Sequence, residues 1–171
     1  MEKTFSPLDV KQLNENIFRL LDDEWMLVTA GSKEHFNTMT ASWGGFGILW
    51  NRPVAFVFIR PQRYTFEFTE KHDRFTLSFF GKEHREVLSY CGSRSGRDVD
   101  KVKETGITPL ATPSGNICFL ESKLVFECKK LFRNDFLAEH FTEKELTGNY
   151  YPEKDFHRMY IGEITSAFER R

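Results

Sequence analysis

The order of apolar and polar residues along the chain predicts short β-strands separated by brief helices. Apolar or alternating stretches that favour strands occupy residues 25–30, 36–42, 53–59, 75–80, 117–131, 136–141 and 158–168. Short helices are expected over residues 6–13, opening at Ser6-Pro7, over 64–69, and over 83–89 with an end by Gly92. The stretch 53–59 is apolar at consecutive positions, which is typical of a strand buried on both faces.

Seven short strands with few helices favour a mainly β fold, either a barrel or a sandwich. A parallel βαβ fold is disfavoured, because the helices that would cover its sheet are missing. The chain contains no internal repeat, low-complexity stretch or long polar linker. Residues 1–171 are therefore predicted to form a single domain.

Composition and charge narrow the class of protein. The 171 residues carry 24 Lys plus Arg against 25 Asp plus Glu, and 40% are hydrophobic, which fits a soluble domain that builds its core without metal or disulfide staples. Near-neutral net charge argues against binding to nucleic acid, which requires excess Lys and Arg. No stretch resembles a membrane span or a secretory signal, so we expect a cytoplasmic protein that makes no membrane contact.

The cysteines argue against a metal site, and most aromatic residues have an expected structural use. Cys91, Cys118 and Cys128 form no Cys-x-x-Cys pair, so we expect buried free thiols and no metal site. Most of the 18 Phe fall in strand-like stretches, where core packing or dimer contact is the expected use. Gly44-Gly45-Phe46-Gly47 resembles a glycine-rich nucleotide loop, but no third glycine follows at the spacing of a dinucleotide fingerprint and no long helix opens behind it. Phosphate-loop, zinc-helix and nucleophile-elbow motifs are absent as well.

The basic run Cys91-Gly92-Ser93-Arg94-Ser95-Gly96-Arg97-Asp98-Val99-Asp100-Lys101 is a candidate phosphate site. Its glycines let successive N–H groups converge, its serines add donors, and Arg94, Arg97 and Lys101 supply charge. Such a loop suits one phosphate monoester. The alternative is a solvated turn that caps a helix.

Two further stretches suit the same ligand. Ile59-Arg60-Pro61-Gln62-Arg63-Tyr64-Thr65 leaves a buried strand and enters a helix, so its arginines can reach a phosphate, or can pair with Glu67 or Glu70 on the surface. Asn37-Thr38-Met39-Thr40-Ala41-Ser42-Trp43 offers hydroxyls, an amide and backbone groups to the rim of a planar heteroaromatic ring. In the alternative interpretation, its Thr and Ser residues occupy the wet face of an ordinary strand.

Taken together, these three stretches, Ser78-Phe79-Phe80 and the ending His157-x-x-Tyr160-Ile161-Gly162-Glu163-Ile164 resemble the flavin reductase-like, flavoredoxin-type family of FMN-binding split barrels. The resemblance spans about residues 15–168. It implies a six-stranded Greek-key split β-barrel and a homodimer with one non-covalent FMN per protomer near the interface. The residues that it implies for FMN binding are Asn37, Thr38, Met39, Thr40, Ala41, Ser42, Trp43, Arg60, Arg63, Tyr64, Thr65, Ser78, Phe79, Ser93, Ser95, Gly96, Arg97 and Lys101.

The resemblance also assigns parts of the ligand to these residues. Residues 38–42 would line the isoalloxazine ring and ribityl chain, and residues 60–65 and 93–101 would follow the ribityl chain and hold the phosphate. Trp43 and the Phe79-Phe80 pair are candidates to border the ring, with core packing as the alternative for one of the pair, since consecutive strand residues face opposite ways. His157 is either near the flavin of a partner subunit or structural. Whether Arg94 or Arg97 turns inward stays open.

The function implied is an oxidoreductase that transfers a hydride from NADH or NADPH to FMN and then electrons to free flavin, a metal complex or a protein. A flavin brings its own redox chemistry, so no catalytic residue of the chain is assigned. One alternative is a flavoredoxin-like electron carrier without nicotinamide activity. Another is a non-catalytic split barrel that binds haem, flavin or another planar ligand.

Overall fold

A large antiparallel sheet forms the frame of the molecule in the computed structural model, which describes residue 1 and residues 5–170. The strands are β1 (Phe5–Pro7), β2 (Met26–Gly31), β3 (Phe36–Ala41), β4 (Gly44–Leu49), β5 (Arg52–Ile59), β6 (Arg74–Phe79), β7 (Pro109–Ala111), β8 (Ile117–Phe119), β9 (Leu124–Asp135) and β10 (Arg158–Arg170). The helices are α1 (Ile17–Arg19), α2 (Tyr64–Lys71), α3 (Arg85–Ser93), α4 (Lys101–Thr105) and α5 (Glu145–Tyr150). Single helical turns occupy Val10–Gln12, Leu20–Glu24, Lys82–His84 and Ala138–His140.

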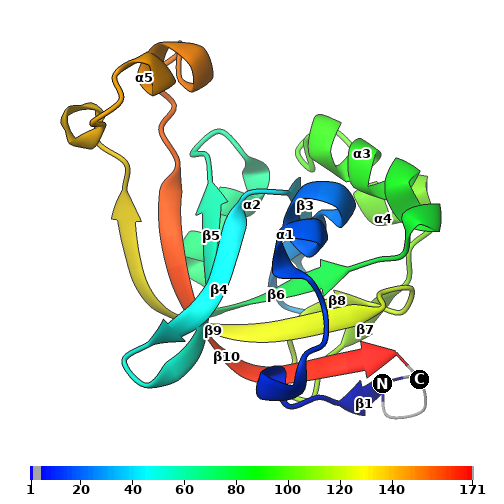
Figure 1. The fold of residues 1–171 in the computed structure, drawn as a ribbon. Helices are drawn as coiled ribbons and strands as arrows, with labels where there is room; N and C mark the ends of the chain where they lie inside the picture. Colours follow the sequence, from blue (N-terminus) through cyan, green and yellow to red (C-terminus); the bar gives the residue numbers. More distant parts are fainter. Residues whose placement is uncertain (2–4, 171) are drawn as a thin grey trace.

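The sheet runs in the order β3-β2-β6-β9-β10-β5-β4, and β1 pairs with the end of β10. It curls around a core, with α3 and α4 at one side and α5 on a long excursion between β9 and β10 (Figure 1). The fold is the mainly β split barrel expected from the sequence. In the described part of the chain the sheet has eight strands, because β1 and β4 extend the six that were expected.

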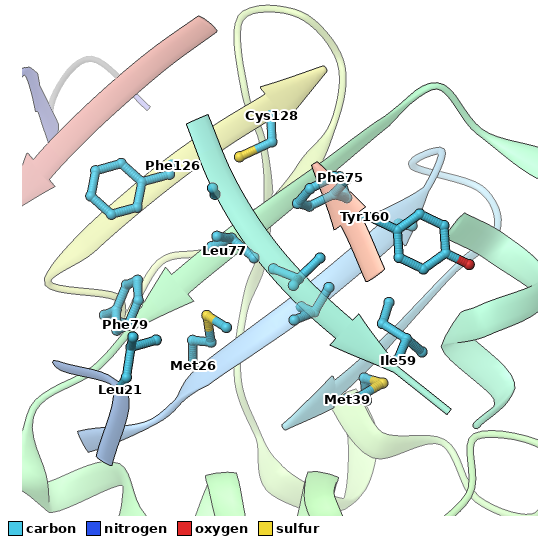
Figure 2. Close-up of a cluster of buried hydrophobic side chains, with 14 of the residues drawn as sticks. Leu21, Met26, Met39, Ile59, Phe75, Leu77, Phe79, Phe126, Cys128 and Tyr160 are labelled. Atoms are coloured by element: carbon cyan, nitrogen blue, oxygen red, sulfur yellow. The ribbon is translucent and has the colours of Figure 1, made fainter. Parts of the chain in front are cut away.

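The core follows from alternation along the strands. Phe75, Leu77 and Phe79 on β6 point inward together with Phe126 and Cys128 on β9, as Figure 2 shows. The intervening Thr76 and Ser78 are also fully buried, on the other face of β6. Thr76 donates to the carbonyl of Ile117, so the β7–β8 hairpin covers that face. Both faces of β6 are therefore buried, and the strand is a rigid support for its neighbours β2 and β9.

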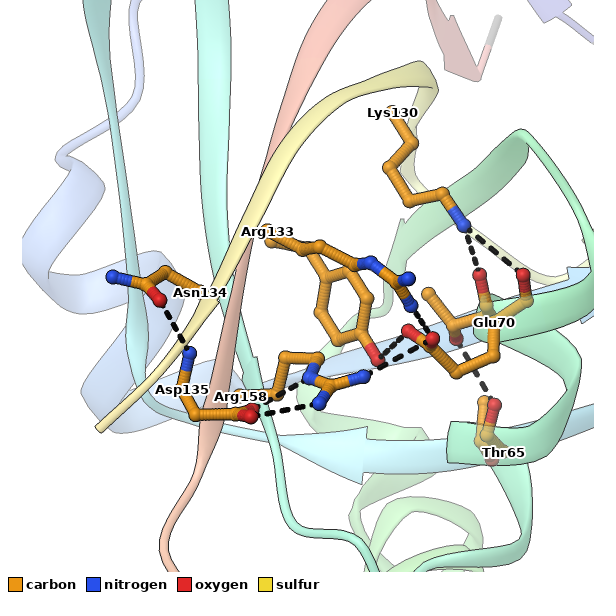
Figure 3. A network of polar contacts seen from close by, with 9 residues as sticks. Thr65, Glu70, Lys130, Arg133, Asn134, Asp135 and Arg158 are labelled. Atoms are coloured by element: carbon orange, nitrogen blue, oxygen red, sulfur yellow. Dashed lines mark hydrogen bonds and ion pairs between the residues drawn. The ribbon is translucent and has the colours of Figure 1, made fainter. Parts of the chain in front are cut away.

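An ion-pair network joins α2 to β9 and β10 (Figure 3). The Glu70 carboxylate receives a hydrogen bond of 2.7 Å from the Tyr160 hydroxyl and pairs with Arg133 and with Arg158, the latter at 3.1 Å. Arg158 also holds Asp135 through two bonds of 2.6 and 2.7 Å. These contacts fix α2 against the barrel, and with it the turn at residues 60–63 that precedes the helix.

Three sequence predictions differ from the structure. Residues 6–13 do not form a helix: Phe5–Pro7 is strand β1 and Val10–Gln12 is a single turn capped by Asp9. Pairing with β10 and burial of Phe5 beside Phe168 outweigh the local helix signal. The stretch 117–131 is interrupted, since β8 ends at Phe119 and β9 begins at Leu124.

The third difference is residues 136–141, which are not a strand. Phe136 makes a ring contact with Phe58 at 5.5 Å and Phe141 with Tyr151 at 5.8 Å, so their apolar character serves to pack the excursion between β9 and β10. The sequence also failed to indicate β4, whose three glycines weaken the strand signal. At Gly44 a side chain would approach the Phe56 carbonyl to 2.8 Å, so only glycine fits the pairing with β5.

The remaining strand and helix predictions are confirmed to within a few residues. Cys91, Cys118 and Cys128 are free and buried, as expected. Among the described residues, no helix combines the length and the apolar character needed to cross a membrane.

Candidate functional site

Two adjoining cavities lie along β3 and the turn that leads into α2. The first cavity, of about 360 Å³, is lined by Met39–Trp43, Phe58, Arg60, Gln62, Arg63 and His157. The second cavity, of about 570 Å³, is lined by residues 34–38, Tyr64, Phe68, residues 96–102 and Pro109. Met39 and Arg63 line the first cavity, and their neighbours in the chain, Thr38 and Tyr64, line the second. The two cavities therefore adjoin at these residues.

The outer part of the first cavity is aromatic and without net charge. The Trp43 ring lies 5.4 Å from the ring of His157 and 5.6 Å from that of Tyr150. Arg60 is neutralised there, because it donates to Asp155 at 2.6 Å and to the Tyr150 carbonyl at 2.9 Å. This end of the cavity therefore suits an uncharged planar group.

The junction of the two cavities carries unpaired positive charge. Arg63 donates to the Cys91 carbonyl at 3.4 Å, and Lys101 Nζ donates to the carbonyls of Cys91 and Thr38 at 2.8 Å each. Neither side chain forms an ion pair with a carboxylate in the described part of the chain. Burial and the neighbouring Arg60 lower the pKa of Arg63, and burial with Arg63 nearby lowers the pKa of Lys101 to about 8. A buried lysine and a half-buried arginine without a counter-ion form a site for an anionic group.

The loop at residues 93–100 closes over the start of β3. A side chain at Gly96 would overlap the Asn37 amide oxygen and approach the Tyr64 ring to 3.2 Å, so a residue without Cβ is required at this contact. Asn37 in turn donates to Thr65 at 2.7 Å. These contacts connect the three stretches that the sequence singled out.

Within that loop, the structure distinguishes the two arginines. Arg97 lines the second cavity, where it donates to the Gln62 carbonyl at 3.0 Å, pairs with Glu67 at 2.5 Å and lies 4.8 Å over the Tyr64 ring. Arg94 is exposed and lines neither cavity. Of the two, Arg97 is the one that lines a cavity, although its side chain is exposed as well. Glu67, expected as a possible partner of Arg60 or Arg63, pairs with Arg97 instead.

The other residues expected at the site lie at different depths. Thr40, Ala41 and Ser42 line the first cavity, and Thr40 also donates to the Leu88 carbonyl at 2.5 Å. Ser95 accepts from the Arg97 backbone N–H at 3.2 Å, and the exposed Ser93 donates to the Tyr90 carbonyl at 3.3 Å. Both serines thus shape the loop through local hydrogen bonds.

Five expected residues line neither cavity: Ser93 and Ser95 of the loop, and three that are buried elsewhere. Thr65 is fully buried beneath Asn37, and Ser78 is fully buried in β6. Phe79 belongs to the barrel core, where its ring lies 6.0 Å from that of Phe126. Neither Ser78 nor Phe79 lines either of the two cavities.

The sequence analysis missed a group of residues on the excursion, on β5 and in the turn that follows β5. Phe58 and Gln62 line the first cavity, Asp155 pairs with Arg60, and Tyr151 bonds to His157 Nδ1 at 2.8 Å. The aromatic residues within 150–157 were the sequence signal that could have indicated this group. The pairing of Asp155 with Arg60, which lies 95 positions earlier in the chain, gave no sequence pattern that points to it.

A third cavity, of about 560 Å³, adjoins the outer end of the first. Ser42, Trp43 and Phe58 line both, and the third also contains Phe18 and Gly44. Phe18 is 84% exposed and Trp43 is 47% exposed. Two exposed aromatic side chains, with Asn16, Arg19, Asp22 and Asp23 around them, therefore border the aromatic end of the first cavity.

Comparison with known proteins identifies relatives of the chain. The family model described as the flavin reductase like domain matches residues 18–171. No curated protein sequence matches the chain.

Among solved structures, flavoredoxin from Methanosarcina acetivorans aligns with a TM-score of 0.68 and 21% identity over 85% of this chain and 68% of that one. The FMN-binding domain of a flavin reductase-like enzyme from Shewanella baltica aligns with a TM-score of 0.70 and 19% identity over 96% and 76% of the two chains. An NADH:FAD oxidoreductase from Streptomyces globisporus aligns with a TM-score of 0.65 and 14% identity over 86% and 78%. At these identities the structural likeness shows a shared fold.

Proposed function

Because the chain belongs to the flavin reductase-like domain family, we propose that it is a flavoprotein oxidoreductase that holds FMN non-covalently along β3. We infer further that a reduced nicotinamide, NADH or NADPH, is the electron donor. The acceptor is a free flavin, a metal complex or a protein. A cytoplasmic location belongs to the same proposal.

The observation that supports this function best is the separation of charge along the site. The unpaired cations Arg63 and Lys101 lie at the junction of the two cavities, whereas the outer end beside Trp43 and His157 is aromatic and neutral. A ligand that fits both ends has a strongly anionic group and an uncharged planar ring. FMN has this form, with a phosphate at one end and an isoalloxazine ring at the other.

Each part of the site has a role in this proposal. Arg63 and Lys101 hold the phosphate, and Arg97 closes the loop beside it through Gln62 and Glu67. Thr40, Ala41 and Ser42 line the path of the ribityl chain and the ring, and Trp43 borders the ring. FMN, when bound, supplies the hydride and electron chemistry, and the chain contributes orientation and control of access.

The same proposal includes a homodimer. Phe18 and Trp43 are exposed beside the open end of the first cavity, and burial of such a surface favours association. A second subunit placed there would also exclude water from the ring end. Light scattering should give a dimeric mass for the wild-type chain and a monomeric mass for Phe18→Glu. Ile48→Glu, at a 65% exposed site on the far hairpin, should remain dimeric.

An absorption spectrum of the purified protein, followed by anaerobic titration with NADH and with NADPH, tests the function. A flavin band that either nucleotide bleaches supports the oxidoreductase, and chromatography of the released flavin identifies FMN or FAD. A band that neither nucleotide bleaches, while a reduced protein donor does, supports the electron carrier instead. A preparation that binds no flavin even when FMN is added contradicts both.

A further inference from the structure

Tyr151 and His157 form a buried pair at the wall of the first cavity. The Tyr151 hydroxyl lies 2.8 Å from His157 Nδ1, and the two residues are 6% and 8% exposed. Tyr151 lies just after α5 and His157 just before β10, so the bond closes the end of the excursion onto the barrel. The bond therefore fixes how the imidazole faces the cavity.

The donors and acceptors available to the pair determine the tautomer of His157. A phenol has one proton to donate, and a buried hydroxyl needs an acceptor for it. Within the described part of the chain, His157 Nδ1 is the one hydrogen-bond partner of the Tyr151 hydroxyl. Tyr151 therefore donates and Nδ1 accepts, which leaves the proton of a neutral imidazole on Nε2.

The surroundings keep this imidazole neutral and in place. Burial, together with the nearby positive charge of Arg60, lowers the pKa of His157 to about 4. The Arg60 guanidinium lies 5.2 Å over the Tyr151 ring and is itself held by Asp155 and by the Tyr150 carbonyl. The Trp43 ring at 5.4 Å and the Phe58 ring at 6.5 Å border the imidazole.

We propose that Tyr151 is a positioning residue that holds His157 as the Nε2–H tautomer, so that His157 presents a neutral hydrogen-bond donor to an uncharged planar ring in the first cavity. The group that receives this bond is a carbonyl oxygen or an unprotonated ring nitrogen. The identity of that ring, as flavin or nicotinamide, rests on the proposed function. The assignment of the tautomer does not depend on the proposed function.

Nitrogen NMR of ¹⁵N-histidine-labelled, ligand-free protein tests the tautomer directly. The chain has five histidines, and the His157→Gln spectrum identifies the signals of His157 by their loss. The expected result is a protonated Nε2 and an unprotonated Nδ1 at pH 7, and a mixture of tautomers in Tyr151→Phe. A wild-type His157 protonated at Nδ1 overturns the proposal, as does a Tyr151→Phe spectrum without change.

Kinetics test whether the donor acts on the ligand. With FMN bound, Tyr151→Phe should slow flavin reduction by NADH at saturation by about 2- to 10-fold, the effect of one hydrogen bond, with little change in KM for NADH. His157→Gln places an amide N–H where Nε2–H stood, so it should retain most of the rate, and adding Tyr151→Phe to it should have no further effect. Tyr90→Phe is the matched control, since Tyr90 lines neither cavity, and it should leave the rate unchanged.

The outcomes separate this proposal from the proposed function. If wild-type protein binds FMN but no nicotinamide bleaches it, the proposed donor is wrong, while the NMR result still decides the tautomer. If reduction occurs and Tyr151→Phe slows it equally in the wild-type and His157→Gln backgrounds, Tyr151 does not act through His157 and the inference fails.

Discussion

Arg63 and Lys101 donate to the same acceptor, the carbonyl oxygen of Cys91, at 3.4 and 2.8 Å. This shared contact places two cations side by side at the junction of the two cavities. Burial and Arg60 lower the pKa of Arg63, and burial and Arg63 lower the pKa of Lys101, so the ligand-free site carries an electrostatic cost that a bound anion would relieve.

Replacing Arg63 should weaken FMN binding. Loss of a charge-assisted hydrogen bond costs about 1.5–3 kcal/mol, so Arg63→Ala should raise the Kd for FMN about 10- to 150-fold and purify with less yellow colour. Fluorescence quenching of FMN on binding measures the Kd. Arg94→Ala, which removes an exposed arginine outside both cavities, should bind FMN like the wild type. Equal affinity of the Arg63→Ala protein and the wild type would count against the phosphate site.

The affinity for FMN should fall as the pH rises through about 8. Lys101 has a lowered pKa of about 8 in the ligand-free protein, so it is charged below that pH and loses its charge above it. The phosphate is already dianionic there, since its second pKa is about 6. The Kd measured from about pH 7 to 9.5 should therefore rise by up to about tenfold per pH unit. Lys101→Arg, which stays charged, should show a flat profile, and a wild-type profile as flat as that variant's would contradict the role of Lys101.

The same lysine makes a prediction for stability. Its pKa is lower in the folded protein than the ordinary value of 10.5, so folding disfavours the charged amine. This penalty is present in full below about pH 8 and is relieved as the pH rises from there toward 10.5. Replacing Lys101 by Met should therefore raise the unfolding midpoint in urea at pH 7 more than at pH 10. The two midpoints moving equally, or the reverse order, would show that burial does not penalise this charge.

Gly96→Ala should disturb the loop and the site together. Its Cβ would overlap the Asn37 amide, and relief of such overpacking costs about 1–3 kcal/mol. We expect a lower melting temperature and a weaker affinity for FMN, measured by thermal scans with and without FMN. Gly148→Ala is the matched control: it lies in α5 with open space around it, so it should leave binding unchanged and raise stability by up to about 1 kcal/mol.

Substitutions at Phe79 and Trp43 should distinguish a residue that packs the core from one that contacts the ligand. Phe79 is fully buried between Phe46 and Phe126, so Phe79→Leu should lower the free energy of unfolding by about 1 kcal/mol and leave the Kd for FMN unchanged. Trp43→Ala, at a half-exposed site on the first cavity, should weaken FMN binding with little effect on unfolding. The opposite pattern would place Phe79, and not Trp43, against the flavin.

Much of the site was visible in the sequence because its residues come in short contiguous stretches. Residues 37–43, 60–65 and 93–101 each combine polar donors or charge with a strand end or a turn, and such local patterns can be recognised from the sequence alone. The structure brings the three stretches together through Gly96, Asn37 and Thr65. Which arginine lines a cavity could not be read from spacing, because contacts of Arg97 with Tyr64 and Glu67 decide it.

The sequence by itself determined the class of fold and predicted the chemistry of the ligand. Alternation of apolar residues sets which face of each strand is buried, and a near-zero net charge makes a local group of Arg and Lys distinct. Only the tertiary structure decided the roles of β4, of residues 136–157 and of Tyr151. Those roles depend on contacts between residues distant in the chain, such as Arg60 with Asp155 and Gly44 with Phe56, and no local pattern encodes the packing that brings such pairs together.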